Sequence, residues 1–546
     1  MNRYKKIIFF CALMGTTAAH AQQTAKDSTL NRTVVVENEY NPEVMDAYKV
    51  NILPQIEEPA VSKKQIQYAQ ESRKFHSWNF TPIQPFARTI EAEQPQRGFL
   101  RTGYGNRSNT DVLASYLWDI TDRDRMDVVG SFYGHDGKIP MGITDNKWNS
   151  RFFRADASAA YSHRFEALTL KMGCNFASQV FNYMNNGMEK TATDHQHFTM
   201  GGGYIGVESH NPLSRFSYAA QAGFDAFSRK NSTPGIMDGR EMKIHLQGYT
   251  TMKLDKGHMA RIDFSMDNMI YNNNADNFTL FKIKPSYTFG DDDITLRAGI
   301  NLDAQTSFGS RLKVSPDICF QYTFASSYVF FANISGGTTL NDYTRLNQST
   351  PYWDYQSQPV TTYSPLDAST GLKASPVAGV HFSIYGGYRI VDDELFACPL
   401  DNDASLVYSN LYQWDAKVAY VGASAQYSLC DVFGFNLSGK YNHWDVDDEV
   451  QEYMVYKPKL EVNASVSAQP LNHLNLTLAY DYISRFKVYG VRAKAVSDLS
   501  LAAHYDIMKS LKVFVNARNL LNQKYMLEGA YPVQGISVLG GISVSF

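Results

Sequence analysis

The chain is poor in cysteine, in charge and in long apolar runs. Five of its 546 residues are cysteine, and charged residues make up only 19% of it, with Lys+Arg 51 against Asp+Glu 54. So few cysteines exclude a disulfide framework. A formal net charge of -3 gives no basis for a nucleic-acid partner. After the first two dozen residues no apolar run reaches the roughly 18–20 residues that a membrane helix needs, which excludes a polytopic helical membrane protein.

Aromatic residues, in contrast, are abundant. Tyr 35, Phe 32 and Trp 6 together make up 13% of the chain. A chain so rich in large apolar side chains can bury enough surface to fold, so disorder is excluded as well. The composition leaves an all-β protein, which is either a large soluble protein or a membrane barrel.

Residues 1–21 have the pattern of a secretory signal peptide. The first six residues include three basic ones, residues 7–17 are mostly apolar, and Ala19 and Ala21 supply the small side chains of a cleavage site. We therefore expect an exported protein whose mature chain begins at Gln22.

Apolar and polar residues alternate from about residue 98 to the end of the chain. Residues 474–482 are one example, in which Leu or Tyr occupies every second position and mostly polar residues lie between them. Residues 260–267, 294–303 and 460–466 repeat the pattern. A period of two predicts β-strands with one apolar face and one polar face, and no helical period is sustained in this part of the chain.

The connections between the predicted strands fall into two alternating classes. Ten are short polar turns, near residues 121–125, 164–168, 211–215, 254–258, 290–293, 324–327, 375–379, 430–433, 470–474 and 507–510. Eleven others, most of them longer, lie near residues 106–110, 134–150, 178–195, 229–240, 271–276, 303–310, 337–366, 391–413, 443–455, 485–494 and 519–535. Together they predict about 22 strands.

Alternating short and long connections are typical of a transmembrane antiparallel β-barrel with short periplasmic turns and longer extracellular loops. A soluble propeller would show a repeat of roughly 40–50 residues, and none is present. A soluble β-sandwich would not require two classes of loop. We therefore expect residues 98–546 to form a barrel in the outer membrane of a Gram-negative bacterium, surrounded by its lipids.

The C-terminal residues carry a resemblance to a known family. Apolar side chains at alternate positions end in a terminal aromatic residue, which looks like the insertion signal of outer-membrane barrels, with Ile542, Val544 and Phe546 as its members. Just upstream, the run Asn-Leu-Leu-Asn-Gln-Lys-Tyr resembles the final loop of TonB-dependent receptors, with Asn519, Leu520, Asn522 and Tyr525 at the matching positions. The resemblance covers residues 98–546.

The resemblance implies uptake of a bulky, scarce ligand across the outer membrane, such as an iron chelate, cobalamin or a glycan. It also implies energy supplied by an inner-membrane partner, which would be TonB or another energy-coupling protein. Neither a cofactor nor a metal is implied. No catalytic or metal-binding motif stands out in the sequence, so we expect a protein that is not an enzyme.

The N-terminal part departs from the family. Family members carry a plug domain inside the barrel, whereas only the 76 residues 22–97 precede the first predicted strand, and we expect them to be an irregular periplasmic or lumen segment. This segment contains a β-branched run that resembles the TonB box, with Thr33, Val34, Val35, Val36 and Glu37 as its members. Such a run can pair with a partner by strand addition.

A barrel of 22 strands without a plug would enclose a large aqueous hole. Three solutions are open from the sequence: residues 22–97 enter the lumen, the loops 337–366 and 391–413 fold inward or cap the mouth, or a separate protein blocks the pore. The first of these loops is rich in aromatic residues suited to ligand capture or partner docking, namely Tyr343, Tyr352, Trp353, Tyr355 and Tyr363.

Two functions therefore compete. The first is a TonB-dependent receptor-like barrel for uptake of a bulky ligand. The second is a plugless, receptor-derived barrel that serves as a structural or docking subunit of an outer-membrane complex, with a surface lipoprotein or other outer-membrane subunits as partners.

Overall fold

The computed structural model describes residues 96–140, 147–185, 195–210, 214–230, 238–254, 257–272, 275–291, 293–307, 311–355, 358–401, 406–430, 432–488, 491–526 and 531–546. The predicted signal peptide, residues 22–95 and the box-like run Thr33–Glu37 lie outside the described residues. They remain predictions.

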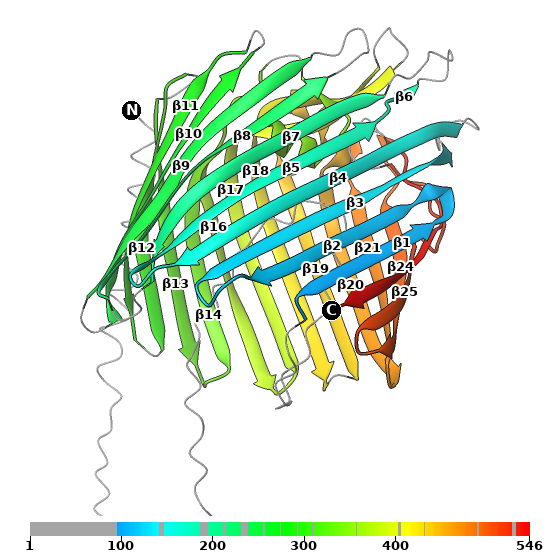
Figure 1. Cartoon of the computed structure of the whole chain (residues 1–546). Helices are drawn as coiled ribbons and strands as arrows, with labels where there is room; N and C mark the ends of the chain where they lie inside the picture. Colours follow the sequence, from blue (N-terminus) through cyan, green and yellow to red (C-terminus); the bar gives the residue numbers. More distant parts are fainter. Residues whose placement is uncertain are drawn as a thin grey trace, which may run out of the picture. The chain divides into compact units, whose positions relative to one another are not determined.

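A single sheet of 24 strands makes up most of the described part of the chain. Two of these strands have only two residues each, and the other 22 pair with their neighbours in chain order and antiparallel, as predicted. β1 pairs with β26, so the sheet closes into a barrel, and Figure 1 shows the C-terminal strand beside β1.

The strands differ widely in length. Their bounds are β1 Gly98–Gly105, β2 Thr110–Asp119, β3 Asp124–Pro140, β4 Lys147–Arg164, β5 Leu168–Phe181, β6 Met184–Asn185, β7 Gln196–Ser209, β8 Phe216–Lys230, β9 Gly239–Lys253, β10 Met259–Tyr271, β11 Phe278–Gly290, β12 Ile294–Gln305 and β13 Leu312–Phe324. The second half comprises β14 Tyr328–Thr339, β15 Trp353–Asp354, β16 Thr362–Val377, β17 Val380–Asp401, β18 Leu406–Leu429, β19 Phe433–Asp445, β20 Pro458–Leu471, β21 Leu474–Arg485, β24 Val496–Met508, β25 Leu511–Arg518 and β26 Ser537–Ser545.

Little of the described chain is helical. The helices there are η1 (Asn106–Ser108), α2 (Tyr343–Ser349) and η3 (Asp448–Tyr456), and a separate small hairpin joins β22 (Lys487–Val488) to β23 (Val491–Arg492). Within the described residues, no helix has the length and apolar character needed to cross a membrane.

All ten short turns lie where the sequence predicts them. The turn between β16 and β17 is only two residues long, and its Gly379 has a φ of 80°. Two-residue hairpin turns require this left-handed conformation, which glycine adopts without strain. The ten turns gather at one end of the barrel, and we refer to this end as the short-turn end and to the opposite one as the long-loop end.

Two predicted loops are wrong. Most of residues 134–150 belong to strands: β3 extends to Pro140 and β4 begins at Lys147. Most of residues 391–413 also belong to strands, since β17 and β18 reach 22 and 24 residues. About 9–11 tilted residues suffice to cross a bilayer, so these strands continue well past it. Beyond the lipid the outward face is no longer required to be apolar, and the alternation that marks a strand is lost.

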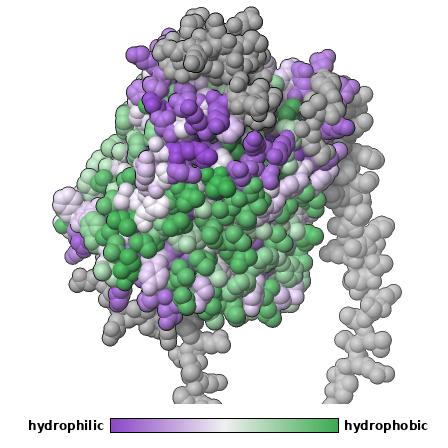
Figure 2. All heavy atoms as spheres, turned by 90° about the vertical axis from the view of Figure 1, so that its right-hand side faces the viewer, coloured by the Kyte–Doolittle hydropathy of each residue, from purple (hydrophilic) through white to green (hydrophobic). Residues whose placement is uncertain are grey.

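The outward faces of the strands form an apolar belt. Leu246 pairs in register with Met266, and Phe264 pairs with Ile283, so these side chains share one face. Leu246 and Phe264 are each 38% exposed despite their size. Figure 2, which faces the side of the barrel where β1 and β25 lie, shows hydrophobic residues gathered over the middle of the outer surface, below a hydrophilic end. A closed barrel with such a belt is suited to a lipid bilayer.

The closing strand pair lies as expected from the sequence. Ile542 pairs with Thr102 and Val544 with Leu100, and the Phe546 carbonyl accepts hydrogen bonds from the backbone N–H groups of Arg97 and Gly98. This pairing leaves no strand edge open to lipid. Recognition of these residues by an assembly machinery remains a prediction.

Candidate functional site at the long-loop mouth of the barrel

The connection between β14 and β16 folds into the barrel. We name it the lumen segment; it comprises residues 340–361, of which the structure describes all but 356–357. It contains α2 and β15. Asp342 begins the helix, because its side chain accepts a hydrogen bond from the Arg345 backbone N–H at 2.8 Å. Thr344 on α2 lines the same pocket as inward-facing residues of β3 to β9, so the helix lies inside the lumen.

The barrel wall changes character where it meets this segment. Towards the short-turn end, the inward side chains of β5 and β8 include Asn175 and Asp225. Towards the long-loop end, the same faces carry Phe181 on β5, Phe198 on β7 and Phe227 on β8, all at most 3% exposed. An apolar inward face requires a covering partner, and the lumen segment supplies it.

Aromatic side chains of the lumen segment pack on this apolar wall. Tyr343 and Trp353 are 2% and 0% exposed. The Trp353 ring lies 6.2 Å from the ring of Phe198, and the Tyr352 ring stacks at 3.6 Å on that of Tyr531. The cluster also includes Leu346, Tyr355, Tyr183, Met184, Trp148 and Leu411. Such packing resembles a protein core more than an open binding surface.

A buried ion pair fixes β15 to the wall. The Arg229 Nη1 atom lies 3.0 Å from Asp354 Oδ1, and the two side chains are only 2% and 5% exposed. Arg229 also donates to the Trp353 carbonyl at 3.0 Å, and its guanidinium lies 4.3 Å from the centre of the Trp353 ring. Burial raises the pKa of the Asp354 carboxyl, and the charge of Arg229 opposes this shift. Loss of either partner would leave an uncompensated charge in the interior.

Polar wall residues hold α2 at its beginning and in its middle. Both carboxylate oxygens of Glu241 accept from the Tyr343 backbone N–H, at 3.0 and 2.9 Å. Lys243 Nζ lies 2.9 Å from Asp342 Oδ2. Hence two N–H groups of the first helical turn, which have no partner within the helix, are satisfied by the wall and the cap: that of Tyr343 by Glu241 and that of Arg345 by Asp342.

An amide pair adds a third anchor on α2. The Gln179 and Asn347 side chains exchange two hydrogen bonds, at 3.2 and 3.1 Å. Both residues are buried. Each side chain thereby satisfies the other's donor and acceptor in a place that water does not reach.

The β17–β18 hairpin covers the lumen segment and crosses the mouth. β18 pairs in parallel with β15, where Trp353 aligns with Ser409 and Asp354 with Asn410. It also pairs with β6, where Val407 aligns with Met184. β6 follows β5, and β5 and β18 lie halfway round the ring of 22 strands from each other. The hairpin therefore spans the long-loop mouth to the opposite wall.

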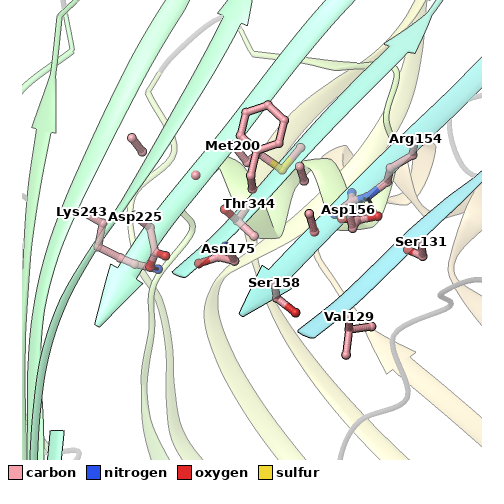
Figure 3. Close-up of a pocket in the computed structure, with 15 residues that line it drawn as sticks. Val129, Ser131, Arg154, Asp156, Ser158, Asn175, Met200, Asp225, Lys243 and Thr344 are labelled. Atoms are coloured by element: carbon pink, nitrogen blue, oxygen red, sulfur yellow. Dashed lines mark hydrogen bonds and ion pairs between the residues drawn. The ribbon is translucent and has the colours of Figure 1, made fainter. Parts of the chain in front are cut away.

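A pocket of about 330 Å³, lined by both polar and apolar side chains, lies on the wall beside α2. Its Arg154 and Asp156 form an ion pair at 2.8 Å, and its Lys243 and Asp225 form another at 3.3 Å. Figure 3 shows these two pairs on either side of the pocket, with Asn175 between them. Groups of this kind hydrogen-bond polar solutes, and no nucleophile–base pair is among them. Within the described residues, no cluster of His, Cys, Asp or Glu side chains could hold a metal ion.

The predicted aromatic loop is thus the lumen segment together with the start of β16. The structure brings Tyr343, Tyr352, Trp353 and Tyr355 into one buried cluster. Tyr363 lies apart from it on β16, where its hydroxyl donates to the Val314 carbonyl at 2.8 Å. Contact of these residues with a ligand or partner remains a prediction.

The final loop of the family-like motif is held by its own polar groups. Asn519 donates to the carbonyls of Gln523 and Gln534, each at 2.9 Å. The Tyr525 hydroxyl donates to Asp498 at 3.2 Å. Leu520 N–H bonds to the Leu499 carbonyl and Asn522 N–H to that of Asn519. The motif shapes the connection between β25 and β26, and a direct role in ligand binding is not needed to account for it.

Sequence reasoning missed the wall residues that hold the lumen segment, which are Gln179, Arg229, Glu241 and Lys243. Each faces inward near the long-loop end of its strand, and each binds a partner more than 90 residues away in the chain. The signal that was available is an aromatic residue near the end of a strand on its inward, otherwise polar face, as in Phe181, Phe198 and Phe227.

The barrel shares its fold with solved receptors and a transporter. The ferric enterobactin receptor PfeA of Pseudomonas aeruginosa aligns with a TM-score of 0.65 and 12% identity over 84% of this chain and 81% of that chain. The siderophore receptor PirA of Acinetobacter baumannii aligns with a TM-score of 0.66 and 9% identity over 84% and 81%. The copper transporter OprC aligns with a TM-score of 0.61 and 13% identity over 83% and 80%.

At these identities the likeness concerns the fold, which is that of outer-membrane receptor barrels. No protein-family model and no curated protein matches the sequence.

Proposed function

We propose that this chain is a TonB-dependent receptor-like barrel that takes up a bulky ligand across the outer membrane. The observation that carries the proposal is a 22-strand barrel whose mouth is crossed by a hairpin of its own chain and whose lumen holds a further segment through noncovalent contacts. A ring of this size encloses a lumen wide enough for a large solute. A closure that hydrogen bonds, two ion pairs and apolar packing hold against the wall can be released, as passage of a ligand requires.

The fold likeness to receptors for ferric enterobactin and siderophores, and to a copper transporter, supports transport rather than catalysis. Energy for release would come from TonB or another energy-coupling protein, which would pair with Thr33–Glu37 by strand addition. The outer belt would contact outer-membrane lipids directly.

A specific observation favours the second candidate, a structural or docking subunit. The aromatic residues that would capture a ligand are buried against the wall, with Trp353 at 0% and Tyr355 at 5% exposed. A barrel that stays closed could serve an outer-membrane complex as a membrane anchor. A surface lipoprotein or other outer-membrane subunits would be its partners.

The test replaces residues 340–361 by a short Gly-Ser linker and measures entry of the bulky antibiotic vancomycin into a Gram-negative host. The same linker inserted at the short turn 472–473 is the control. We expect the replacement to increase vancomycin sensitivity at unchanged abundance in the outer membrane, and the control to have no effect. An intact permeability barrier in the replacement variant would mean that the lumen is not a passage.

The energy coupling is tested by Val35→Pro, because proline removes a backbone donor that strand addition requires. We expect cross-linking of the chain to TonB to fall, with Val35→Ala as the control. Equal cross-linking of both variants, together with co-purification of the wild type with other outer-membrane subunits, would favour the second candidate.

A further inference from the structure

Two neighbouring strands, β16 and β17, are bulged below the long-loop mouth. Between residues 363 and 367, β16 has one residue more than either of its partners, β14 and β17. Between Val391 and Glu394, β17 has one residue more than β18. A β-bulge bends its strand and changes its direction. Because Tyr363 pairs with Asp392, the two bulges are adjacent, and Gly337 of β14, which pairs with Ser364, continues their line across the wall.

Backbone conformation along this line is unusual. Gly337 has a φ of 133° and Asp393 a φ of 58°, both in the left-handed region. The Asp393 carbonyl has lost its place in the ladder and accepts instead from Thr362 Oγ1 at 2.8 Å and Gln413 Nε2 at 3.0 Å. Side chains thus satisfy the backbone at this bulge, and fewer ladder bonds join the strands there than in a regular pair.

Several polar side chains beside this line have oxygens without a hydrogen-bond partner. Asn301 Nδ2 donates to the Gly336 carbonyl at 2.8 Å, and Asp303 Oδ2 accepts from the Thr338 N–H at 2.6 Å. The remaining side-chain oxygens there, on Asn301, Asp303, Ser315 and Thr338, are buried and have no protein partner. Unpaired buried oxygens favour rearrangement or hydration over a tightly fixed ladder.

Everything beyond the line is joined into one body. Gln413 on β18 bonds both backbone groups of Val360 in the lumen segment, at 2.7 and 2.9 Å. The Ser409 N–H bonds to the Tyr352 carbonyl at 2.9 Å. Leu411 of the hairpin lies in the same apolar cluster as the lumen segment. The hairpin and the lumen segment therefore cannot separate without breaking several contacts.

Glu394 is one of the contacts that hold this body to the neighbouring wall, beside the buried Phe396, which packs with Val450 and Met454 of η3. Glu394, directly beyond the bulge of β17, lies 2.9 Å from Lys457 Nζ and 3.9 Å from Arg389 Nη2. Lys457 also donates to the Leu395 carbonyl at 2.8 Å, and its ammonium lies 4.6 Å from the centre of the Phe396 ring. Lys457 belongs to the β19–β20 connection. Arg389 precedes the bulge of β17, on the part of the strand nearer the membrane. Both residues therefore lie outside the body formed by the hairpin and the lumen segment.

We propose that the lumen segment and the β17–β18 hairpin beyond residue 394 form a single lid, which turns about this line of bulges and whose closed position is favoured by the charge of Glu394. The proposal rests on the proposed function, since it names how passage through the same lumen is regulated. Opening breaks the contacts of Glu394 with Lys457, the packing of Phe396 on η3 and the β6–β18 pairing at the tip. It also separates the lumen segment from its polar anchors and from the apolar wall.

The first test measures single-channel conductance of the full chain in planar bilayers. Glu394→Gln keeps the size of the side chain and removes its charge, and Asp263→Asn makes the same change in an ion pair on the membrane part of the wall. Hydrogen bonds to charged groups are strong enough that we expect openings roughly tenfold more frequent in Glu394→Gln. Asp263→Asn should behave as wild type. Equal opening frequencies in the two variants would overturn the role of Glu394.

The second test asks whether the two elements move together. In Glu394→Gln with the native cysteines replaced by serine, Met184→Cys and Val407→Cys would join the hairpin to the opposite wall, and Asn185→Cys with Leu406→Cys offers a second pair. The control is Ser383→Cys with Ser424→Cys, which joins β17 to β18 below the bulges. We expect either tip disulfide to suppress the openings until a reductant is added, and the control disulfide to have no effect.

Openings that persist with a tip disulfide would show that the lumen segment moves without the hairpin, and would overturn the single lid. These measurements need no ligand and no energy source. If the permeability test fails but the tip disulfides suppress the openings, only the proposed function is contradicted. If the permeability test succeeds but the tip disulfides have no effect, only the lid is contradicted.

Discussion

The two ends of the barrel use the same strands in opposite ways. Towards the short-turn end, inward side chains are polar and partly hydrated, as in the ion pair Arg261–Asp263, whose side chains are 35% and 37% exposed. Towards the long-loop end, inward side chains are aromatic or form fully buried pairs such as Arg229–Asp354. The difference shows that a barrel wall acquires a core only where the chain folds back to cover it.

The energetic consequence is that charge contributes differently at the two ends. An ion pair that water reaches contributes about 0–1 kcal/mol. A buried pair contributes little net stability when complete, but breaking it costs about 3–5 kcal/mol, because one charge is left uncompensated. The lumen segment should accordingly be sensitive to single substitutions that the rest of the lumen tolerates.

The largest effect is expected for Arg229→Met. This change leaves Asp354 buried without its partner and should destabilise the closed lumen segment by about 3–5 kcal/mol. Hydrogen exchange of peptides covering residues 343–355 measures the change. Combining it with Asp354→Leu removes both charges and should restore most of the protection. Unchanged exchange in Arg229→Met would mean that the ion pair does not hold the segment.

An intermediate effect is expected on the lipid face. Leu246 points outward and is 38% exposed, whereas its neighbour Gln247 points into the lumen. Leu246→Arg should cost about 2–4 kcal/mol near the bilayer midplane, and less towards the interfaces. Urea unfolding in lipid vesicles gives the free energy. Gln247→Arg is the matched control and should be nearly neutral, so equal losses in the two variants would contradict the assigned faces.

The smallest effect is expected for Arg261→Met, the counterpart of Arg229→Met in the hydrated part of the lumen. Because its ion pair is about one-third exposed, the loss should stay below about 1 kcal/mol in the same unfolding experiment. A loss as large as that of Arg229→Met would remove the distinction between the two ends.

Much of the fold was predictable because the strands of a membrane barrel alternate apolar and polar residues, and this two-residue period is visible in the sequence. Lipid on one side and water on the other force alternation, so the 22 strands and all ten short turns follow from residues 98–546. Where the strands pass beyond the bilayer, the alternation is no longer required. The sequence of residues 134–150 and 391–413 therefore predicts loops although the structure has strands there.

The site was predictable only in part. The aromatic residues of 337–366 marked the loop as important, and inward folding was one of three open solutions for closing the lumen. Which solution applies depends on contacts such as Glu241 with Tyr343, 102 residues apart. Local periodicity carries no information about such pairs. The hairpin that crosses to β6 was hidden for the same reason.

The central claim is that the described chain closes its own long-loop mouth. Planar-bilayer conductance of two deletion variants tests it most directly, one lacking residues 22–95 and one with residues 340–361 replaced by a short linker. We expect the first variant to remain closed, because the lumen segment and the hairpin are intact, and the second to show a large, steady conductance. A large, steady conductance in the variant lacking residues 22–95, with little change in the other, would contradict the account.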